Sequence, residues 1–136
     1  MYKKFLRFRL AQEWYLVDVG DVLEIFTYRE TVPVPGSAHE ILGILNIRGR
    51  IVPILSGYSL FNLSGIEERV DGKIIILETK KADFGIVVDD VSEILELDEN
   101  VIEFSTESIK NQNITGTASH EDQTLILVNF SSIYTR

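Results

Sequence analysis

The sequence predicts an all-β protein, built as a single barrel or as paired barrels. Short apolar runs recur along the chain and are bounded by Gly, Asn, Asp and Pro, which is the pattern of strands joined by turns. No segment carries a helical periodicity long enough to connect parallel strands. The 136 residues match one ordinary domain, so we expect a single domain over residues 1–136.

The N-terminal part of the chain predicts a hairpin followed by two helical turns. Leu6–Leu10 alternates apolar residues with arginines, as a half-buried strand does. Trp14–Val19 is the second strand, and we expect its tryptophan in the core. Asp21 is expected to cap a helical turn over Val22–Ile25, and Ser37 is expected to cap another turn.

The middle of the chain predicts a second hairpin with a charged tip. Two apolar runs, Ile41–Ile47 and Ile51–Leu55, flank the sequence Arg48-Gly49-Arg50. Gly49 supplies the positive φ that a tight reversal needs. Pro53 has no N–H group for a ladder, so the second strand is expected at an edge or a bulge. The tip arginines either face solvent without a role or face a partner.

The second half predicts more strands after a polar connection. The segment from Ser56 to Gly72 is polar and rich in glycine, so it is the expected connection between two lobes, at residues 56–72. A helical turn is expected at the C-terminus, over Phe130–Arg136. The remaining strands are predicted at residues 73–79, 84–88, 91–97, 101–104, 113–119 and 124–128.

Composition excludes several classes of partner. The net charge of −8 disfavours binding to nucleic acid and to anionic membranes. No apolar run approaches the roughly 18 residues of a membrane span, so we expect no membrane insertion. Arg7 and Arg9 interrupt the apolar part of any signal peptide, and cysteine is absent. The sequence therefore predicts a soluble, cytoplasmic protein.

The residues that carry chemistry do not form a recognisable catalytic or metal-binding motif. His39 and His120 are the only histidines, and neither has partners at the spacing of a metal site. Of Asp89 and Asp90, we expect one carboxylate to cap a bend and the other to be solvated. No catalytic, cofactor-binding or metal-binding residue is predicted, and an enzyme is not expected. A small-ligand-binding β-barrel remains an alternative.

Several motifs, in order along the chain, resemble the CheW family of bacterial chemotaxis coupling proteins. The most specific is LGILNIRGRIVPIL, which is similar to the family's Gly, Asn-Leu-Arg-Gly and Val-Pro signature. The other matching segments are Val22–Ile25, Val34–Gly36, Phe84–Asp89, Ile114–Gly116 and Leu125–Asn129.

The resemblance implies two five-stranded SH3-like barrels packed on a shared core. It also implies a non-enzymatic adaptor between the cytoplasmic tip of a chemoreceptor and the regulatory domain of the histidine kinase CheA. A scaffold of another signalling array is the alternative within the same family. The positions that match the family's kinase or receptor contacts are Val22, Glu24, Gly43, Arg48 and Gly49.

For some of these five positions, another explanation competes with partner contact. Arg48 is interpreted as a contact residue, whereas Glu24 is either a contact or a solvated carboxylate. Backbone geometry is the simpler explanation for Gly43 and Gly49. The chain departs from the family after the Val-Pro strand, where Ser56-Gly57 replaces the usual Asp-Leu. This replacement removes a carboxylate and is expected to add flexibility.

Overall fold

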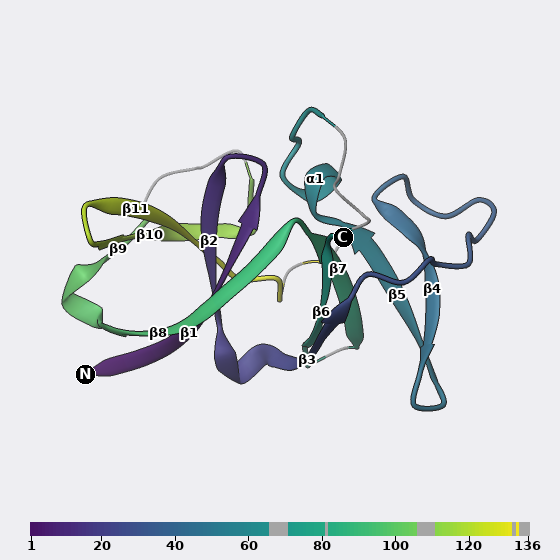
Figure 1. Ribbon diagram of the computed structural model, residues 1–136, viewed down its shortest axis with the longest axis horizontal. Helices are drawn as coiled ribbons and strands as arrows, with labels where there is room; N and C mark the ends of the chain where they lie inside the picture. Colours follow the sequence, from purple (N-terminus) through teal and green to yellow (C-terminus); the bar gives the residue numbers. More distant parts are fainter. Residues whose placement is uncertain (66–70, 81, 106–110, 132, 134–136) are drawn as a thin grey trace.

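The computed structural model in Figure 1 describes residues 1–65, 71–80, 82–105, 111–131 and 133. Its strands form two sheets that lie side by side, with the orders β8-β1-β2-β11-β10-β9 and β3-β6-β7-β5-β4. The six-stranded lobe holds β1 (Tyr2–Leu10), β2 (Glu13–Asp18), β8 (Asp90–Asp98), β9 (Ile102–Phe104), β10 (Ile114–His120) and β11 (Gln123–Val128). The five-stranded lobe holds β3 (Val22–Thr27), β4 (Ile41–Ile47), β5 (Arg50–Ser56), β6 (Lys73–Glu78) and β7 (Asp83–Val88).

The all-β class is therefore confirmed, with one sheet a strand larger than the five expected. The six-stranded sheet ends at the short β9, which pairs with β10 and lies within the strand predicted at residues 101–104. The described chain also contains the short helical segments η1 (Val19–Asp21), α1 (Gly57–Leu60) and η2 (Glu99–Val101). None of the helices in the described part of the chain has the length and apolar character needed to cross a membrane.

Two predicted helical turns are wrong. Residues 22–25 belong to β3, which pairs with β6, and the turn lies just before them in η1. Asp18, not Asp21, caps η1 by accepting from the N–H of Gly20 at 2.8 Å. Ser37 begins no helix, because its hydroxyl donates back to the carbonyl of Val34 at 2.8 Å. Long-range pairing and local side-chain bonds outweigh weak capping signals here. The turn expected over residues 130–136 falls largely outside the described residues.

A single hydrophobic cluster joins the two lobes. Leu6, Phe8 and Leu10 of β1 pack in the same cluster as Leu77 of β6 and Phe84 of β7. Each lobe also has a smaller cluster of its own. Trp14 packs against the cluster of the six-stranded lobe and is only half-buried. The shared cluster means that the lobes bury apolar surface against each other and fold around one core.

The chain passes between the lobes at two places, and neither is the predicted one. Residues 56–72 connect β5 to β6 within the five-stranded sheet. The passages are η1, between β2 and β3, and Asp89, between β7 and β8. The polar composition of residues 56–72 carries no information on which sheets the flanking strands join. Tyr58, Leu60 and Phe61 within this segment are buried in the cluster shared by the lobes.

Asp89 lies buried at the second passage, which corrects the expectation of one capping and one solvated carboxylate. Its Oδ2 accepts from the N–H of Ala11 and from the hydroxyl of Tyr58, both at 2.7 Å. The Nη1 of Arg9 lies 3.9 Å from the same oxygen. We call Asp89, Ala11, Tyr58 and Arg9 the junction cluster. Burial, and then the hydrogen bond to Asp89, raises the pKa of Tyr58 to about 12.

The residues that replace the family's Asp-Leu also lie at this junction. Ser56 is buried and caps α1, because its Oγ accepts from the N–H of Ser59 at 3.1 Å. A Cβ on Gly57 would lie 2.5 Å from the carbonyl oxygen of Val87 and 2.7 Å from Leu10 Cδ2. Gly57 therefore serves a close approach between the lobes and does not add the expected flexibility.

Candidate partner-binding surface

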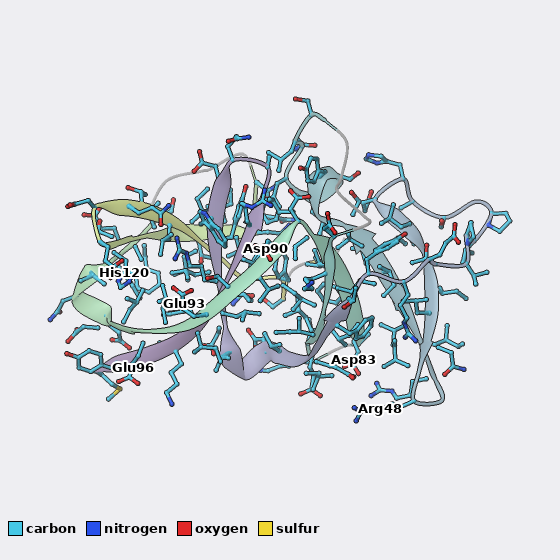
Figure 2. The ribbon with its side chains drawn as sticks, in the orientation of Figure 1. Arg48, Asp83, Asp90, Glu93, Glu96 and His120 are labelled. Carbon is cyan, nitrogen blue, oxygen red and sulfur yellow. The ribbon has the colours of Figure 1, made fainter. Side chains whose placement is uncertain are left out.

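The hairpin of β4 and β5 ends in a two-residue turn. Arg48 and Gly49 occupy it with φ values of 53° and 83°. Positive φ at both positions matches the tight turns that suit antiparallel strands. The Oδ1 of Asn46 accepts from the N–H of Gly49 at 2.9 Å and stabilises the reversal. The turn places Arg48 at the free end of the hairpin (Figure 2).

Two of the predicted site residues meet at this tip. The Nη2 of Arg48 donates to the Oε1 of Glu24 at 3.2 Å. Glu24 lies on β3 and Arg48 follows β4, and these are the two edge strands of the five-stranded sheet. The side chains are 81% and 32% exposed for Arg48 and Glu24 respectively. The ion pair therefore joins the edges of one lobe while both groups remain accessible to a partner.

The second arginine of the tip is also paired within this lobe. The Nη2 of Arg50 lies 2.6 Å from the Oδ2 of Asp83, at the start of β7. The hairpin is thus held by carboxylates from two other strands. Arg48 braces the edges of one lobe and does not reach across the seam between the lobes.

A surface cleft of about 470 Å³ opens beside the Arg48–Glu24 pair, between β3 and the hairpin. We call it the rim cleft. Its lining residues are Glu24, Phe26, Thr27, Tyr28, Arg29, Asn46, Ile47 and Arg48. The guanidinium carbon of Arg29 lies 4.8 Å from the ring centroid of Phe26, a distance typical of cation–π contact. The cleft combines partly buried aromatic rings with charged side chains at its edge.

Val22 and Gly43 are placed differently from the other three predicted residues. Val22 lies opposite Leu77 and is packed against the shared core. A Cβ on Gly43 would lie 2.5 Å from the carbonyl oxygen of Val32, which is bridged to Ile44. Both residues set the position of an edge strand, and neither presents a side chain to the rim cleft.

Sequence reasoning missed Phe26, Tyr28 and Arg29. A period-two signal was present, because Glu24, Phe26 and Tyr28 are two residues apart and fall on one face of an extended chain. Reading residues 22–25 as a helical turn hid that face.

Pro53 lies neither at the expected sheet edge nor at the expected bulge, because it pairs with Ile44, and the irregularity of the β4–β5 ladder lies between Ile41 and Gly43. Its strand β5 is flanked by β4 and β7. The pairing with β7 runs over Ile54–Ser56, so it begins just after Pro53. Pro53 therefore lies outside the β5–β7 ladder. An inner strand can accommodate the proline here, because no hydrogen bond of that ladder needs its missing N–H group.

A second cleft, of about 490 Å³, lies where the lobes meet. Val17, Leu77 and Phe130 supply its apolar part, and Asp21 and Glu78 lie among its polar residues. Burial, followed by the charges of Asp18 and Glu78, raises the pKa of the Asp21 carboxyl. Among the residues that the structure describes, no group of three or more His, Asp or Glu side chains is arranged to hold a metal ion.

The fold and the surface define a class of two-lobed β-proteins with an exposed, charged hairpin at the edge of one lobe. The CheW-like domain family matches residues 4–136, and the chain belongs to this family.

The chain is also similar to individual proteins over most of its length. It is 31% identical to the chemotaxis protein CheW of Klebsiella aerogenes over 134 residues, which is 96% of this chain and 81% of that protein. It is 30% identical to the chemotaxis protein CheW of Thermotoga maritima over 105 residues, 77% of this chain and 69% of that protein. The crystal structure of scaffolding protein TtCheW from Thermoanaerobacter tengcongensis superimposes with a TM-score of 0.92 and 30% identity, covering 100% of this chain and 94% of that chain.

Proposed function

We propose that this chain is a non-enzymatic adaptor of the cytoplasm, which couples the cytoplasmic tip of a chemoreceptor to the histidine kinase CheA. The observation that carries the proposal is the agreement of its whole fold with a scaffolding protein, at a TM-score of 0.92 over 100% of the chain. The names of the relatives, chemotaxis proteins CheW, support the same pathway.

The two-lobed architecture suits this role physically. An adaptor performs no bond-making step, so its task is to hold two proteins in a defined geometry. Two lobes on one core hold the surfaces of either lobe in a fixed relation. A change in the receptor then reaches the kinase through a difference in binding free energy between receptor states.

The partner contact is assigned to five residues around the rim of the five-stranded lobe. Arg48 and Glu24 supply accessible charges, and Arg48 offers a planar fork that suits a carboxylate or backbone carbonyls. Gly49 supplies the positive φ of the two-residue turn that carries Arg48. Val22 and Gly43 contribute indirectly, because their packing positions β3 and β4.

Calorimetric titration tests the proposal. The purified chain is titrated with the regulatory domain of the cognate CheA and, separately, with a receptor fragment that contains the cytoplasmic tip. Both should bind, and addition of the chain to kinase and receptor together should make kinase activity depend on the receptor. A folded chain that binds neither partner would remove the proposed function.

A further inference from the structure

Arg29 differs from the other arginines that the structure describes. Arg7, Arg9, Arg48 and Arg50 each have a carboxylate oxygen within 4.0 Å. In the described part of the chain, Arg29 has no such carboxylate and lies over the ring of Phe26 instead. Stacking holds the guanidinium plane in place while its N–H donors remain available.

The surroundings of Arg29 favour an anionic ligand with an apolar part. Phe26, Tyr28 and Ile47 line the rim cleft and pack against the core of the five-stranded lobe, so they form an apolar floor. Two guanidinium groups, from Arg29 and Arg48, and one carboxylate, from Glu24, line the rim cleft. This local excess of positive charge occurs on a chain whose net charge is −8.

We infer that the rim cleft binds an acidic segment of a partner protein, in which a Glu or Asp carboxylate pairs with Arg29. An apolar side chain next to that carboxylate covers Phe26 and Tyr28. Arg48 already has Glu24 as a partner, so Arg29 is the donor that a new carboxylate can engage without breaking an existing pair. The inference rests on the proposed function only in naming the kinase or the receptor as the source of the segment.

The local chemistry is tested first with peptides. Nuclear magnetic resonance spectra of the ¹⁵N-labelled chain are recorded with acetyl-Glu-Phe-Glu-amide and with the uncharged acetyl-Gln-Phe-Gln-amide. The acidic peptide should shift the amide signals of Thr27, Tyr28 and Asn46. In Arg29→Glu the same peptide should bind weaker by roughly tenfold or more, as expected when a charge-assisted hydrogen bond is lost. Equal shifts with both peptides, or shifts confined to other strands, would overturn the inference.

The protein partners are tested next, with a matched charge control. Lys3→Glu makes the same change in net charge on an exposed residue of β1, in the six-stranded lobe. Arg29→Glu should weaken binding to one of the two partners by roughly tenfold or more, and Lys3→Glu should weaken it by less than about threefold, because a distant surface charge is screened. Arg29→Lys keeps the charge but not the planar fork, and its affinity should fall between wild type and Arg29→Glu.

The outcomes separate this inference from the proposed function. If wild type binds neither partner, the proposed function fails, while the peptide comparison still decides the chemistry of the cleft. If wild type binds both partners and Arg29→Glu, shown to be folded by its thermal melt, binds them equally well, the function stands and the inference is wrong.

Discussion

The junction cluster and the tip of the β4–β5 hairpin each contain an arginine near a carboxylate, but their surroundings differ. At the junction, the Asp89 side chain is 2% exposed and lies 3.9 Å from Arg9. At the tip, the Glu24 side chain is 32% exposed and lies 3.2 Å from Arg48. The closer pair is the more accessible one. Distance alone therefore does not indicate which pair stabilises the fold.

Burial explains the difference between the two sites. Asp89 is shielded from water and accepts hydrogen bonds from Tyr58 and Ala11, so removing its carboxylate takes this acceptor away from both donors in a low-dielectric interior. Water and salt weaken the tip pair in the free protein. The junction is therefore suited to holding the lobes together. At the tip, either charge of the Arg48–Glu24 pair can leave its present ion pair and bind a group of another protein.

Asp89→Ala should produce the largest loss of stability. It removes the acceptor for Tyr58 and Ala11 and leaves Arg9 without its carboxylate, so the free energy of unfolding should fall by about 3–5 kcal/mol. Urea denaturation measures the change. The neighbouring Asp90→Ala, which removes only a bond to the N–H of Val91, should cost about 1 kcal/mol. Equal losses for the two variants would show that burial does not distinguish them.

Gly57→Ala should also destabilise the junction. The new methyl group would enter space held by Val87 O and by Leu10 of the other lobe, and overpacking of this kind costs about 1–3 kcal/mol. At the tip, Gly49 has no neighbouring atom within 4 Å of the added Cβ, so Gly49→Ala should cost only about 1 kcal/mol of backbone strain. Thermal melts of both variants give the comparison, and a greater loss for Gly49→Ala would reverse it.

Arg48→Glu should weaken partner binding and leave the stability of the fold nearly unchanged, whereas the junction variants lower the stability. Under the proposed function, binding to the kinase regulatory domain or to the receptor tip should weaken by about 2 kcal/mol or more. The free energy of unfolding should change by less than about 1 kcal/mol, because the lost ion pair is exposed. Calorimetric titration and a thermal melt measure the two effects. A folded Arg48→Glu protein with unchanged affinity for both partners would exclude Arg48 from the contact.

Raising the pH should produce the smallest effect, and only at the junction. The pKa of Tyr58 is about 12 in the folded chain, against an ordinary value of 10.0. The raised value means that folding favours the protonated phenol, so its contribution is complete below pH 10 and is lost as the pH rises toward 12. Tyr58→Phe should show a shallower loss of stability over this interval than wild type. Identical pH profiles in urea denaturation would argue against this coupling.

Local sequence was sufficient for most of the strands and for the hairpin at the centre of the candidate surface. Alternating apolar residues predicted β1, and the pair of apolar runs around Arg48-Gly49 predicted β4 and β5. Gly49 predicted the positive φ of the turn. These features depend on backbone preferences and on side-chain alternation within a few residues, which can be read from a single sequence.

The tertiary structure decided the rest. Residues 22–25 became a strand because β6 pairs with them, and Asp89 became buried because the lobes close around it. Arg29 and Arg48 line one cleft although 18 residues, Glu30–Ile47, separate them in the sequence. Which side chains meet, and which lose their water, depends on pairing and burial between distant segments. Local preferences of about 1 kcal/mol or less per residue do not encode those contacts.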